Sequence, residues 1–402
     1  MPINGQSVQV GFVARAEEIP PAAWREFFPP AREGAWWYQA LEGGGLEDQF
    51  VFSYAVLTVA GRIVGLAPCF LHDVPIALVA PRPVALVLRG LAVLFPRLGY
   101  QRTLFVGSPC SEEGTVGLAT GVTLGQVLAE LRAAVLARAR ALRAPMVVFK
   151  DFPEPDLPAL RGLAGFTPAL SYPGTVVDLP PPDKEAYFRS LAQTQRHNLR
   201  KKLRRSRELL ALETQVLAHP TDEELEEISG LFLQTYQRGK TKFERLGLPF
   251  FRQIRGRPES RFIVLRTPGG GPAVAFMLVF VLGDRVVNKF IGLDYNREGR
   301  AYLYFRLFEA AVDFTYSLDR HHLQSGQTGY RAKLDLGHAP VPLVNFFRHQ
   351  NPLVHAVFRA VARHITWRSL DADLRVWLEA HPEKEWKLPL SGRDPRGADR
   401  TG

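Results

Sequence analysis

The 402-residue sequence contains only two cysteines, Cys69 and Cys110. Two cysteines cannot build a disulfide framework, and their surroundings lack the spacing of metal ligands. The histidines fit no zinc-binding pattern, and neither Gly-x-Ser-x-Gly nor a Gly-x-Gly-x-x-Gly after a strand is present. These absences argue against a metal site, a nucleophile elbow and a dinucleotide site. Cytoplasmic residence is the default for such a cysteine content.

The sequence also lacks a long uninterrupted apolar run. Its most apolar stretch, residues 74–98, is broken by three arginines and four prolines, whereas a spanning helix needs about 20 apolar residues. Residues 1–10 are polar and lack the apolar centre of a secretory signal. We therefore expect no transmembrane segment. Stretch 74–98 should cover a core, with peripheral contact with a membrane surface as the alternative.

Acidic residues are outnumbered, with 40 Asp and Glu against 50 Lys and Arg, which gives a net charge of +10. This bias favours an anionic partner, such as a nucleotide, a phosphorylated carrier, nucleic acid or a membrane surface. A solvated basic surface is the plain alternative. The length and the 46% hydrophobic content indicate a folded chain of two domains.

The two halves of the chain share one order of predicted elements. A hairpin over residues 53–71, a helix over 123–143 and a strand over 146–150 make up the first half. The second half has strands over 261–266, 273–281 and 285–293, a helix over 302–316 and a strand over 322–325. We therefore expect an N-terminal domain over 1–180, a Pro-rich linker and basic helix over 181–210, a C-terminal domain over 211–370, and a disordered tail over 385–402.

A predicted helix over residues 185–210 has a basic face. Arg196, Arg200 and Arg204 are spaced i, i+4, i+8, and Lys201 spreads the charge sideways. No acid lies between Glu185 and Glu208, so an unrelieved row predicts a phosphate-bearing or nucleic-acid partner. A solvated helix face is the alternative.

Two further segments carry polar side chains next to predicted strand ends. The turn Asn296-Arg-Glu-Gly-Arg300 places Arg297 and Arg300 where backbone N–H groups could meet a pyrophosphate. The segment 324–333 combines amides, hydroxyls and Lys333 with two glycines that permit close approach of a ligand. An ordinary surface turn is the alternative at both places.

Three motifs follow one another in the second half: Arg196-His-Asn-Leu-Arg200, Phe232-Leu-Gln-Thr-Tyr236 and Leu248-Pro-Phe-Phe251. They resemble the Arg-x-Asn-x-Arg, Tyr-x-x-Thr-Tyr and Leu-x-x-x-Phe-Phe segments of the FemAB-like predicted N-acyltransferases of the GNAT superfamily. Residues 302–340 resemble that family more closely, with Gly326, Gln327, Gly329 and Lys333 matching its Gly-Ala-Gln-Gly-Glu-His-Lys run loosely. Thr328, Tyr330 and Arg331 depart from the run.

The resemblance implies an α/β (α+β) fold of two GNAT-like domains, each a mixed twisted sheet flanked by helices. It also implies a transferase that moves an acyl or aminoacyl group to an amine acceptor, which is a small molecule or a peptide. The amine attacks directly, without a covalent enzyme intermediate. The donor is acyl-CoA or aminoacyl-tRNA, so it is a co-substrate. No cofactor is expected to stay bound, and tRNA is a partner if it carries the donor.

We expect Lys333 and Gln327 to orient a reactant, Asp294 to act as a base, and backbone N–H groups over 290–294 to hold the oxyanion. Tyr302 either lies near the leaving group or packs in the core. The residues expected to bind substrate or phosphate are Arg196, Arg200, Lys201, Arg204, Arg297, Arg300, Ser325 and Tyr330. The alternative is a non-catalytic module that binds nucleic acid or a membrane surface through the basic helix.

Overall fold

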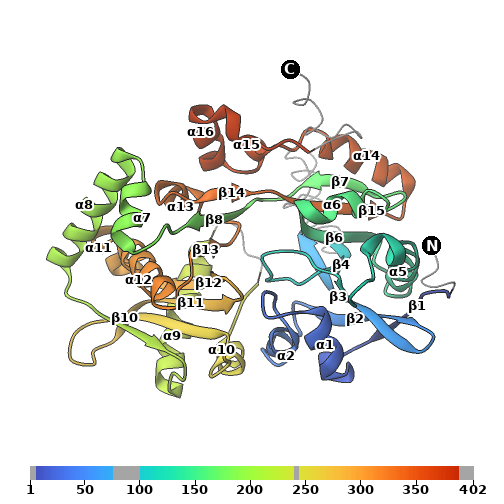
Figure 1. Cartoon of the computed structure of the whole chain (residues 1–402), viewed down its shortest axis with the longest axis horizontal. Coiled ribbons are helices and arrows are strands. Elements are labelled where there is room, and N and C mark those ends of the chain that lie inside the picture. Colours follow the sequence, from blue (N-terminus) through green and yellow to red (C-terminus); the bar gives the residue numbers. More distant parts are fainter. Residues whose placement is uncertain (1–5, 76–99, 240–243, 389–402) are drawn as a thin grey trace, which may run out of the picture.

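The computed structural model describes residues 6–75, 100–239 and 244–388, and the side chains of residues 299 and 300 lie outside the description. The segment 76–99, in which most of the membrane-contact prediction falls, lies outside it as well, and so do residues 389–402 of the predicted tail. The described residues form two mixed sheets flanked by helices (Figure 1). Within them, no helix is long and apolar enough to cross a membrane.

The first sheet has eight strands, in the order β1-β2-β3-β4-β6-β15-β7, with β5 paired to β3. β4 and β6 are parallel, and the other pairs are antiparallel. The strands are β1 (Gln9–Val13), β2 (Val51–Val59), β3 (Arg62–Pro75), β4 (Tyr100–Val106), β5 (Gly117–Leu118), β6 (Met146–Pro153), β7 (Thr167–Leu170) and β15 (Leu343–His349).

The second sheet has seven strands, in the order β14-β8-β13-β12-β11-β10-β9. Only the pairing of β12 with β13 is parallel among the pairs described. The strands are β8 (Gly174–Asp178), β9 (Glu213–Leu217), β10 (Ser260–Arg266), β11 (Ala273–Leu282), β12 (Arg285–Leu293), β13 (His322–Ser325) and β14 (Ala339–Val341).

The helices begin where the sequence supplies caps. Thr221 opens one with a capping box, and the Asn351 side chain accepts from the backbone N–H groups of Leu353 and Val354, so both predicted starts are confirmed. The helices are α1 (Pro21–Phe27), α2 (Ala35–Glu42), α5 (Leu124–Ala141), α6 (Leu157–Leu160), α7 (Lys184–Ser190), α8 (Gln193–Leu209), α9 (Asp222–Arg238), α10 (Leu248–Ile254), α11 (Tyr295–Ala301), α12 (Leu303–Ser317), α13 (Tyr330–Asp335), α14 (Pro352–Ala362), α15 (Trp367–Leu370) and α16 (Ala372–Ala380).

Two sequence expectations about helices were wrong in detail. The helix expected over 185–210 is two helices, because Leu191 and Ala192 are extended (ψ 146° and 147°) between α7 and α8. The turn expected at 296–300 is the helix α11. Its first N–H groups are therefore partly satisfied by its own cap rather than free for a ligand.

Two strands each belong to the sheet that is otherwise built mainly from the other half of the chain. β8 lies at 174–178, within the stretch assigned to the N-terminal domain, yet it pairs with β13 and β14 of the second sheet. β15 lies at 343–349, within the stretch assigned to the C-terminal domain, yet it completes the first sheet between β6 and β7. The boundaries read from the sequence thus differ from the sheets at these two strands, because strand pairing joins segments far apart in the chain.

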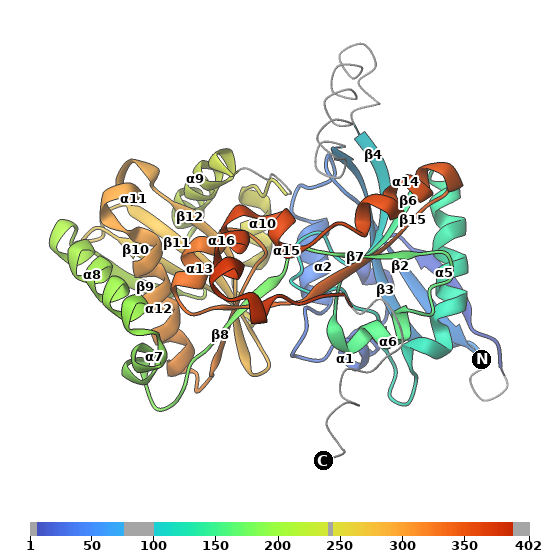
Figure 2. The ribbon, with the colours of Figure 1, turned by 90° about the horizontal axis from the view of Figure 1, so that it is seen from above.

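One buried core joins the two sheets. It contains the apolar side chains of α1, α2 and α5 together with those of α9, α10 and one face of β11. Trp37 of α2 meets Phe250 of α10 and Phe280 of β11 edge to face, with ring centroids 5.9 and 5.5 Å apart. The other face of the second sheet packs against α7, α8 and α12 in a separate core. Figures 1 and 2 show α8 on the far side of this second unit, away from the first sheet.

Candidate active site

A cavity of about 350 Å³ lies on one face of the first sheet. Side chains alternate between the two faces of a strand, so mostly every second residue of neighbouring strands lines it. Intervening side chains such as Leu104 and Val147 belong to the large core instead. The sheet residues that line the cavity are Phe70, His72 and Val74 of β3, Gln101, Thr103 and Phe105 of β4, Met146, Val148, Lys150 and Asp151 of β6, Ala169 and Leu170 of β7, and Asn345 and Phe347 of β15.

Helix α14 and the segment after it close the cavity on the side away from the sheet. Phe358, Val361 and Ala362 of α14 line it, followed by Ile365 and by Leu370 of α15. Ala362 and Phe358 form a small apolar cluster with side chains of β6, β7 and β15, which fixes α14 against the sheet. Figure 2 shows α14 beside β6 and β15. Most of the cavity wall is therefore apolar.

One part of the wall is polar and carries charge. Its members are Lys150, Asp151, Ser171, Glu244, Gln327 and Asn345, which come from β6, from the segment after β7, from the chain before α10, from the segment after β13 and from β15. Residues from both halves of the sequence meet there. The polar wall thus lies where the two sheets adjoin.

Asp151 organises this polar wall. It is buried, its backbone is left-handed (φ 58°), and its carboxylate accepts from the Ser171 hydroxyl and pairs with the Lys150 ammonium. Its backbone N–H donates to Asn345 Oδ1 at 2.7 Å. A non-glycine residue in this backbone region costs about 1–3 kcal/mol and persists where the surroundings enforce it, often at functional sites. The strained residue thereby fixes the direction of Lys150.

Glu244 is the titratable carboxyl on this wall. Burial raises its pKa to about 7, while the charges of Lys150 and Lys289 oppose the shift and Glu112 adds to it. A carboxyl with a pKa near neutrality can take up a proton and release it again at cellular pH. This is the property that a general base requires.

Gln327 offers an unused donor to the cavity. Its Nε2 is buried and has no hydrogen-bond partner among the residues that the structure describes, and the residue lines the cavity. A buried donor without a partner costs about 1–3 kcal/mol. The cost disappears if a substrate oxygen accepts from Nε2.

Lys289 sits in a bulge of β12. Leu278 of β11 pairs with Phe290 and Val279 pairs with Asn288, so Lys289 is the extra residue. Its side chain is 1% exposed, and its Nζ lies 2.5 Å from Glu33 Oε1 and 3.5 Å from Glu112 Oε1.

The ammonium of Lys289 also lies 4.8 Å from the ring centroid of Trp37. Glu33 lies just before α2, Trp37 lies in α2 and Glu112 lies after β4, so this cluster ties the first half of the chain to the second sheet. The pairing of β12 with β13 ends at Asn288 and Ser325. From residue 289 onwards, β12 therefore has no described pairing with β13.

Lys333 is buried in α13 and donates from Nζ to the Gly326 carbonyl at 2.5 Å. Burial lowers its pKa to about 8, and Glu112 counteracts the shift. Gly326 follows β13, and a Cβ at this glycine would lie 3.4 Å from Glu112 Oε2. Lys333 thus holds the segment that carries Gln327, with Glu112 alongside.

Ser325 ends β13 within a buried polar group. Its Oγ lies 3.4 Å from His338 Nε2 and 3.5 Å from Asn288 Nδ2. Burial lowers the pKa of His338 to about 3, and the Lys333 charge adds to the shift, so this imidazole is neutral at cellular pH. Ser325 therefore fixes the strand end.

The structure gives three of the expected site residues roles inside the fold. Tyr330, expected to bind substrate, is buried and donates its hydroxyl to the Pro173 carbonyl at 2.8 Å. Asp294, expected as a base, caps α11 by accepting from Asn296 N–H at 3.0 Å and pairs with Arg297. Tyr302 has a left-handed backbone (φ 52°) at the junction of α11 and α12. The Arg300 side chain lies outside the described residues.

The basic face of α8 is partly neutralised by Glu185 of α7 and by Glu208 at the end of α8, which corrects the view of an unrelieved row. Arg200 pairs with Glu185 at 2.7 Å and Arg204 lies 3.8 Å from Glu208. Arg196 donates to the Arg189 carbonyl at 3.2 Å, and Lys201 is exposed. None of these four basic residues lines the cavity.

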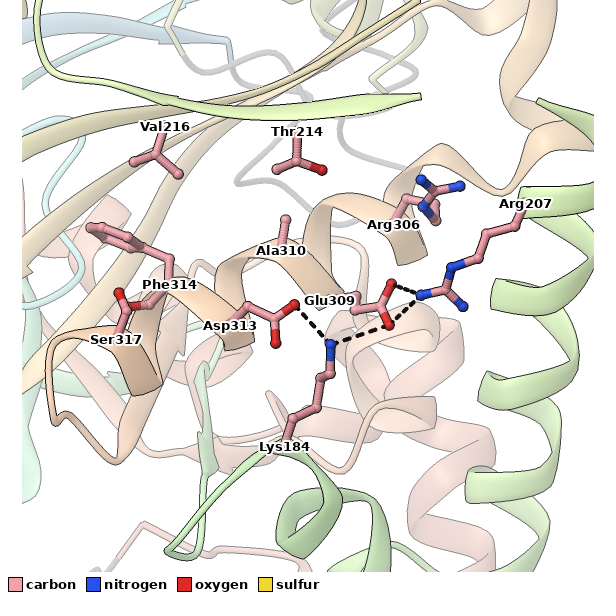
Figure 3. A pocket seen from close by; sticks show the side chains of 10 residues that line it. All are labelled: Lys184, Arg207, Thr214, Val216, Arg306, Glu309, Ala310, Asp313, Phe314 and Ser317. Atoms are coloured by element: carbon pink, nitrogen blue, oxygen red, sulfur yellow. Dashed lines mark hydrogen bonds and ion pairs between the residues drawn. The ribbon is translucent and has the colours of Figure 1, made fainter. Parts of the chain in front are cut away.

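A second pocket, of about 430 Å³, opens between α8, α12 and β9 (Figure 3). Glu309 of α12 accepts from Arg207 at 2.6 Å and lies 3.5 Å from Lys184, which also pairs with Asp313 at 2.8 Å. Arg306 points away from these pairs in Figure 3, and its Nη1 is buried without a described partner. The acids in this pocket balance much of its positive charge.

Sequence reasoning missed Glu244, Lys289, Glu112 and Lys150. Lys289 did carry a signal, because a lone lysine interrupts the apolar strand Val286-Val-Asn-Lys-Phe-Ile and a buried charge needs a partner. Glu112 and Glu244 lie in connecting segments with no periodic pattern. Only the tertiary contacts identify them.

Comparison with known proteins bears on the fold. Residues 193–331 match the family profile of the acetyltransferase (GNAT) domain. The crystal structure of FemX aligns with a TM-score of 0.52 at 11% identity, over 80% of this chain and 93% of that one. A conserved protein of unknown function from Bacteroides thetaiotaomicron VPI-5482 aligns with a TM-score of 0.50 at 12% identity, over 84% and 99% of the two chains. No curated protein matches the sequence.

At such identities the structural likeness shows the fold alone. The match to the GNAT acetyltransferase domain covers residues 193–331, and the two mixed sheets flanked by helices have the architecture of FemX. The expected fold class and the resemblance stated from the sequence are thereby confirmed. The protein has the fold of a GNAT-type acyltransferase.

Proposed function

We propose that this protein is an N-acyltransferase whose reaction takes place at the polar wall of the cavity on the first sheet. The observation that carries the proposal is that Glu244, with a pKa near 7, and Gln327, with a buried unpartnered donor, line the same largely apolar cavity. Transfer to an amine needs a proton acceptor and a donor for the carbonyl oxygen. This wall supplies both beside the second sheet.

In the reaction the amine nitrogen forms a bond to the acyl carbon, and the bond from that carbon to the leaving sulfur or oxygen breaks. Glu244 takes the proton that the amine loses. Gln327 Nε2 donates to the carbonyl oxygen as negative charge develops on it. The proton on Glu244 then passes to the leaving thiolate or alkoxide, so the protein ends the cycle unchanged.

The donor is an acyl-CoA or an aminoacyl-tRNA, and the acceptor is a small or peptide amine. The basic residues of α8 support a phosphate-bearing donor, since Arg200 and Arg204 are exposed, with side-chain exposures of 52% and 75%. Arg297 at the start of α11 extends this surface, because α11 packs against α8. Lys333 acts as a positioning residue, since it holds the Gly326 carbonyl next to Gln327.

A turnover assay with a panel of acyl-CoA donors and amine acceptors tests the proposal, with free thiol and product mass as readouts. Gln327→Leu should lose about 10²- to 10³-fold in kcat, the cost of removing one oxyanion donor. Gln237→Leu, at an exposed position of α9, should retain wild-type turnover. Full activity of Gln327→Leu would move the reaction away from this wall. Native mass spectrometry of the purified protein would separate a bound CoA species from aminoacyl-tRNA.

A further inference from the structure

We infer that the cavity on the first sheet binds an aliphatic chain of the substrate, so that the transferred acyl group or the acceptor amine is lipophilic. The inference rests on the proposed function and names its substrate class. An N-acyltransferase for small polar metabolites has no need of such a cavity, because its substrate ends at the reacting groups.

The lining of the cavity fits a hydrocarbon chain. Away from the polar wall most of it consists of aliphatic and aromatic side chains from β3, β4, β6, β7, β15 and α14, and the polar exceptions are His72, Gln101 and Thr103. Phe70 and Phe105 stack there with ring centroids 4.6 Å apart. Apolar cavities take apolar ligands, and the apolar part of this cavity can do the same. A chain that enters it therefore leaves water for an apolar surface, which favours binding.

The space persists because small side chains stand where large ones would fill it. Ala169 of β7 and Ala362 of α14 belong to one apolar cluster, and both line the cavity. An engineered apolar cavity of about 150 Å³ holds benzene. By that scale a cavity of about 350 Å³ holds on the order of a dozen carbon atoms.

The charged residues of the polar wall give the chain a direction. Glu244, Lys150 and Gln327 lie on it, so a ligand with one polar end and one apolar tail would place its polar end beside the reacting groups. The buried Nε2 of Gln327 has no described partner, which makes it available to that polar end. The chain thus extends from the reaction site along the sheet.

Two substrates could supply the chain, the acyl group of the donor or the alkyl group of the amine. Binding of dodecanoyl-CoA and of dodecylamine to the full-length protein, measured by calorimetry below their micellar concentrations, separates them. Butyryl-CoA and butylamine serve as short-chain references. The substrate that uses the cavity should bind more tightly by about three- to fourfold per added methylene until the cavity is full.

Ala362→Leu should weaken binding of the long-chain probe that uses the cavity by at least tenfold and shorten the longest chain accepted. Ala360→Leu, an identical change at an exposed position of the same helix, should leave the chain-length profile as in wild type. Ala169→Val provides a second filling variant from the opposite wall. Equal chain-length profiles in wild type and both filling variants, or no chain-length dependence for either probe, would overturn the inference.

Binding is measured without turnover, so the two proposals can fail separately. Chain-length-dependent binding with no transfer for any donor and amine pair would leave the chain site standing and remove the proposed function. Transfer that is confined to short substrates, with no chain-length dependence of binding, would leave the proposed function standing and remove the chain site.

Discussion

At the scale of single residues, Glu244 decides how the rate should depend on pH. Burial raises its pKa to about 7, and a general base must be deprotonated to act. The rate of acyl transfer should therefore rise with pH through an inflection near 7. Glu244→Gln should lose that inflection and at least about 10²-fold in kcat, while Glu226→Gln, exposed on α9, should keep the wild-type profile. An unchanged inflection in Glu244→Gln would assign it to another group.

Lys289 should dominate the stability of the contact between the two sheets. It pairs with two carboxylates while its own side chain is 1% exposed. Removing one partner of a buried pair typically costs about 3–5 kcal/mol, so Lys289→Met should lower the free energy of unfolding by roughly that amount at neutral pH. Chemical denaturation of wild type and Lys289→Met measures this loss in the free energy of unfolding.

The loss in Lys289→Met should shrink as the pH falls. Burial already raises the pKa of Glu112, and Lys289 opposes that rise, so without the lysine the pKa should rise further. A carboxyl with a raised folded pKa destabilises the fold when ionised, and the penalty is relieved as the pH drops through that pKa. Adding Glu112→Gln should likewise recover part of the stability. A loss independent of pH would mean that packing, and not charge, is responsible.

At the scale of elements, the contact between β12 and α9 depends on Gly292. A Cβ there would lie 2.3 Å from Phe276 Cε1 and 2.6 Å from the α9 backbone, so Gly292→Ala must push the helix off the sheet. We expect a destabilisation of about 1–3 kcal/mol, typical of an overpacked core. Gly230→Ala within α9 meets no atom within 4 Å and should stabilise the helix by about 0.5–1 kcal/mol. Thermal unfolding measures both variants. The same Gly→Ala change should lower the stability at position 292 and raise it at position 230.

Helix α8 is the element predicted to bind a phosphate-bearing substrate. Replacing Arg196, Arg200 and Arg204 with Gln should raise KM for a phosphate-bearing substrate and flatten its dependence on salt, since each phosphate contact contributes about 0.7–0.9 to the slope of log K against log salt. Arg200 already pairs with Glu185, so its share should be the smallest of the three. Wild-type affinity and salt response in the triple variant would identify α8 as a solvated face.

At the scale of the whole molecule, the two sheets should unfold together. β15 completes the first sheet from late in the sequence, β8 joins the second from early in it, and one core links them. Cutting the chain after residue 180 would leave β6 and β7 without the strand that lies between them. We expect coincident denaturation curves by tryptophan fluorescence and circular dichroism, as for a two-state unit, and no stable fold for fragment 1–180. Two separated transitions would contradict this.

The sequence by itself determined most of the local structure. Alternation and periodicity located β10, β11, β12 and α5, and the caps at Thr221 and Asn351 fixed where α9 and α14 begin. These features depend on residues close together in the chain, so they are visible in sequence. The motifs over 193–251 and the segment after them also indicated the GNAT fold, which the family profile over 193–331 confirms.

Only the tertiary structure decided where the candidate site lies. Glu244 and Lys150 meet because β6 and the chain before α10 come from opposite halves of the sequence and converge on one cavity. Gln327 was expected from the sequence, but its unpartnered donor follows from burial, which depends on contacts distant in the chain. Tyr330 was expected from the sequence to bind substrate. In the fold its hydroxyl donates to the Pro173 carbonyl instead. Residue spacing specifies neighbours within an element, whereas a pKa, a cavity and an unused donor arise only when separate elements pack together.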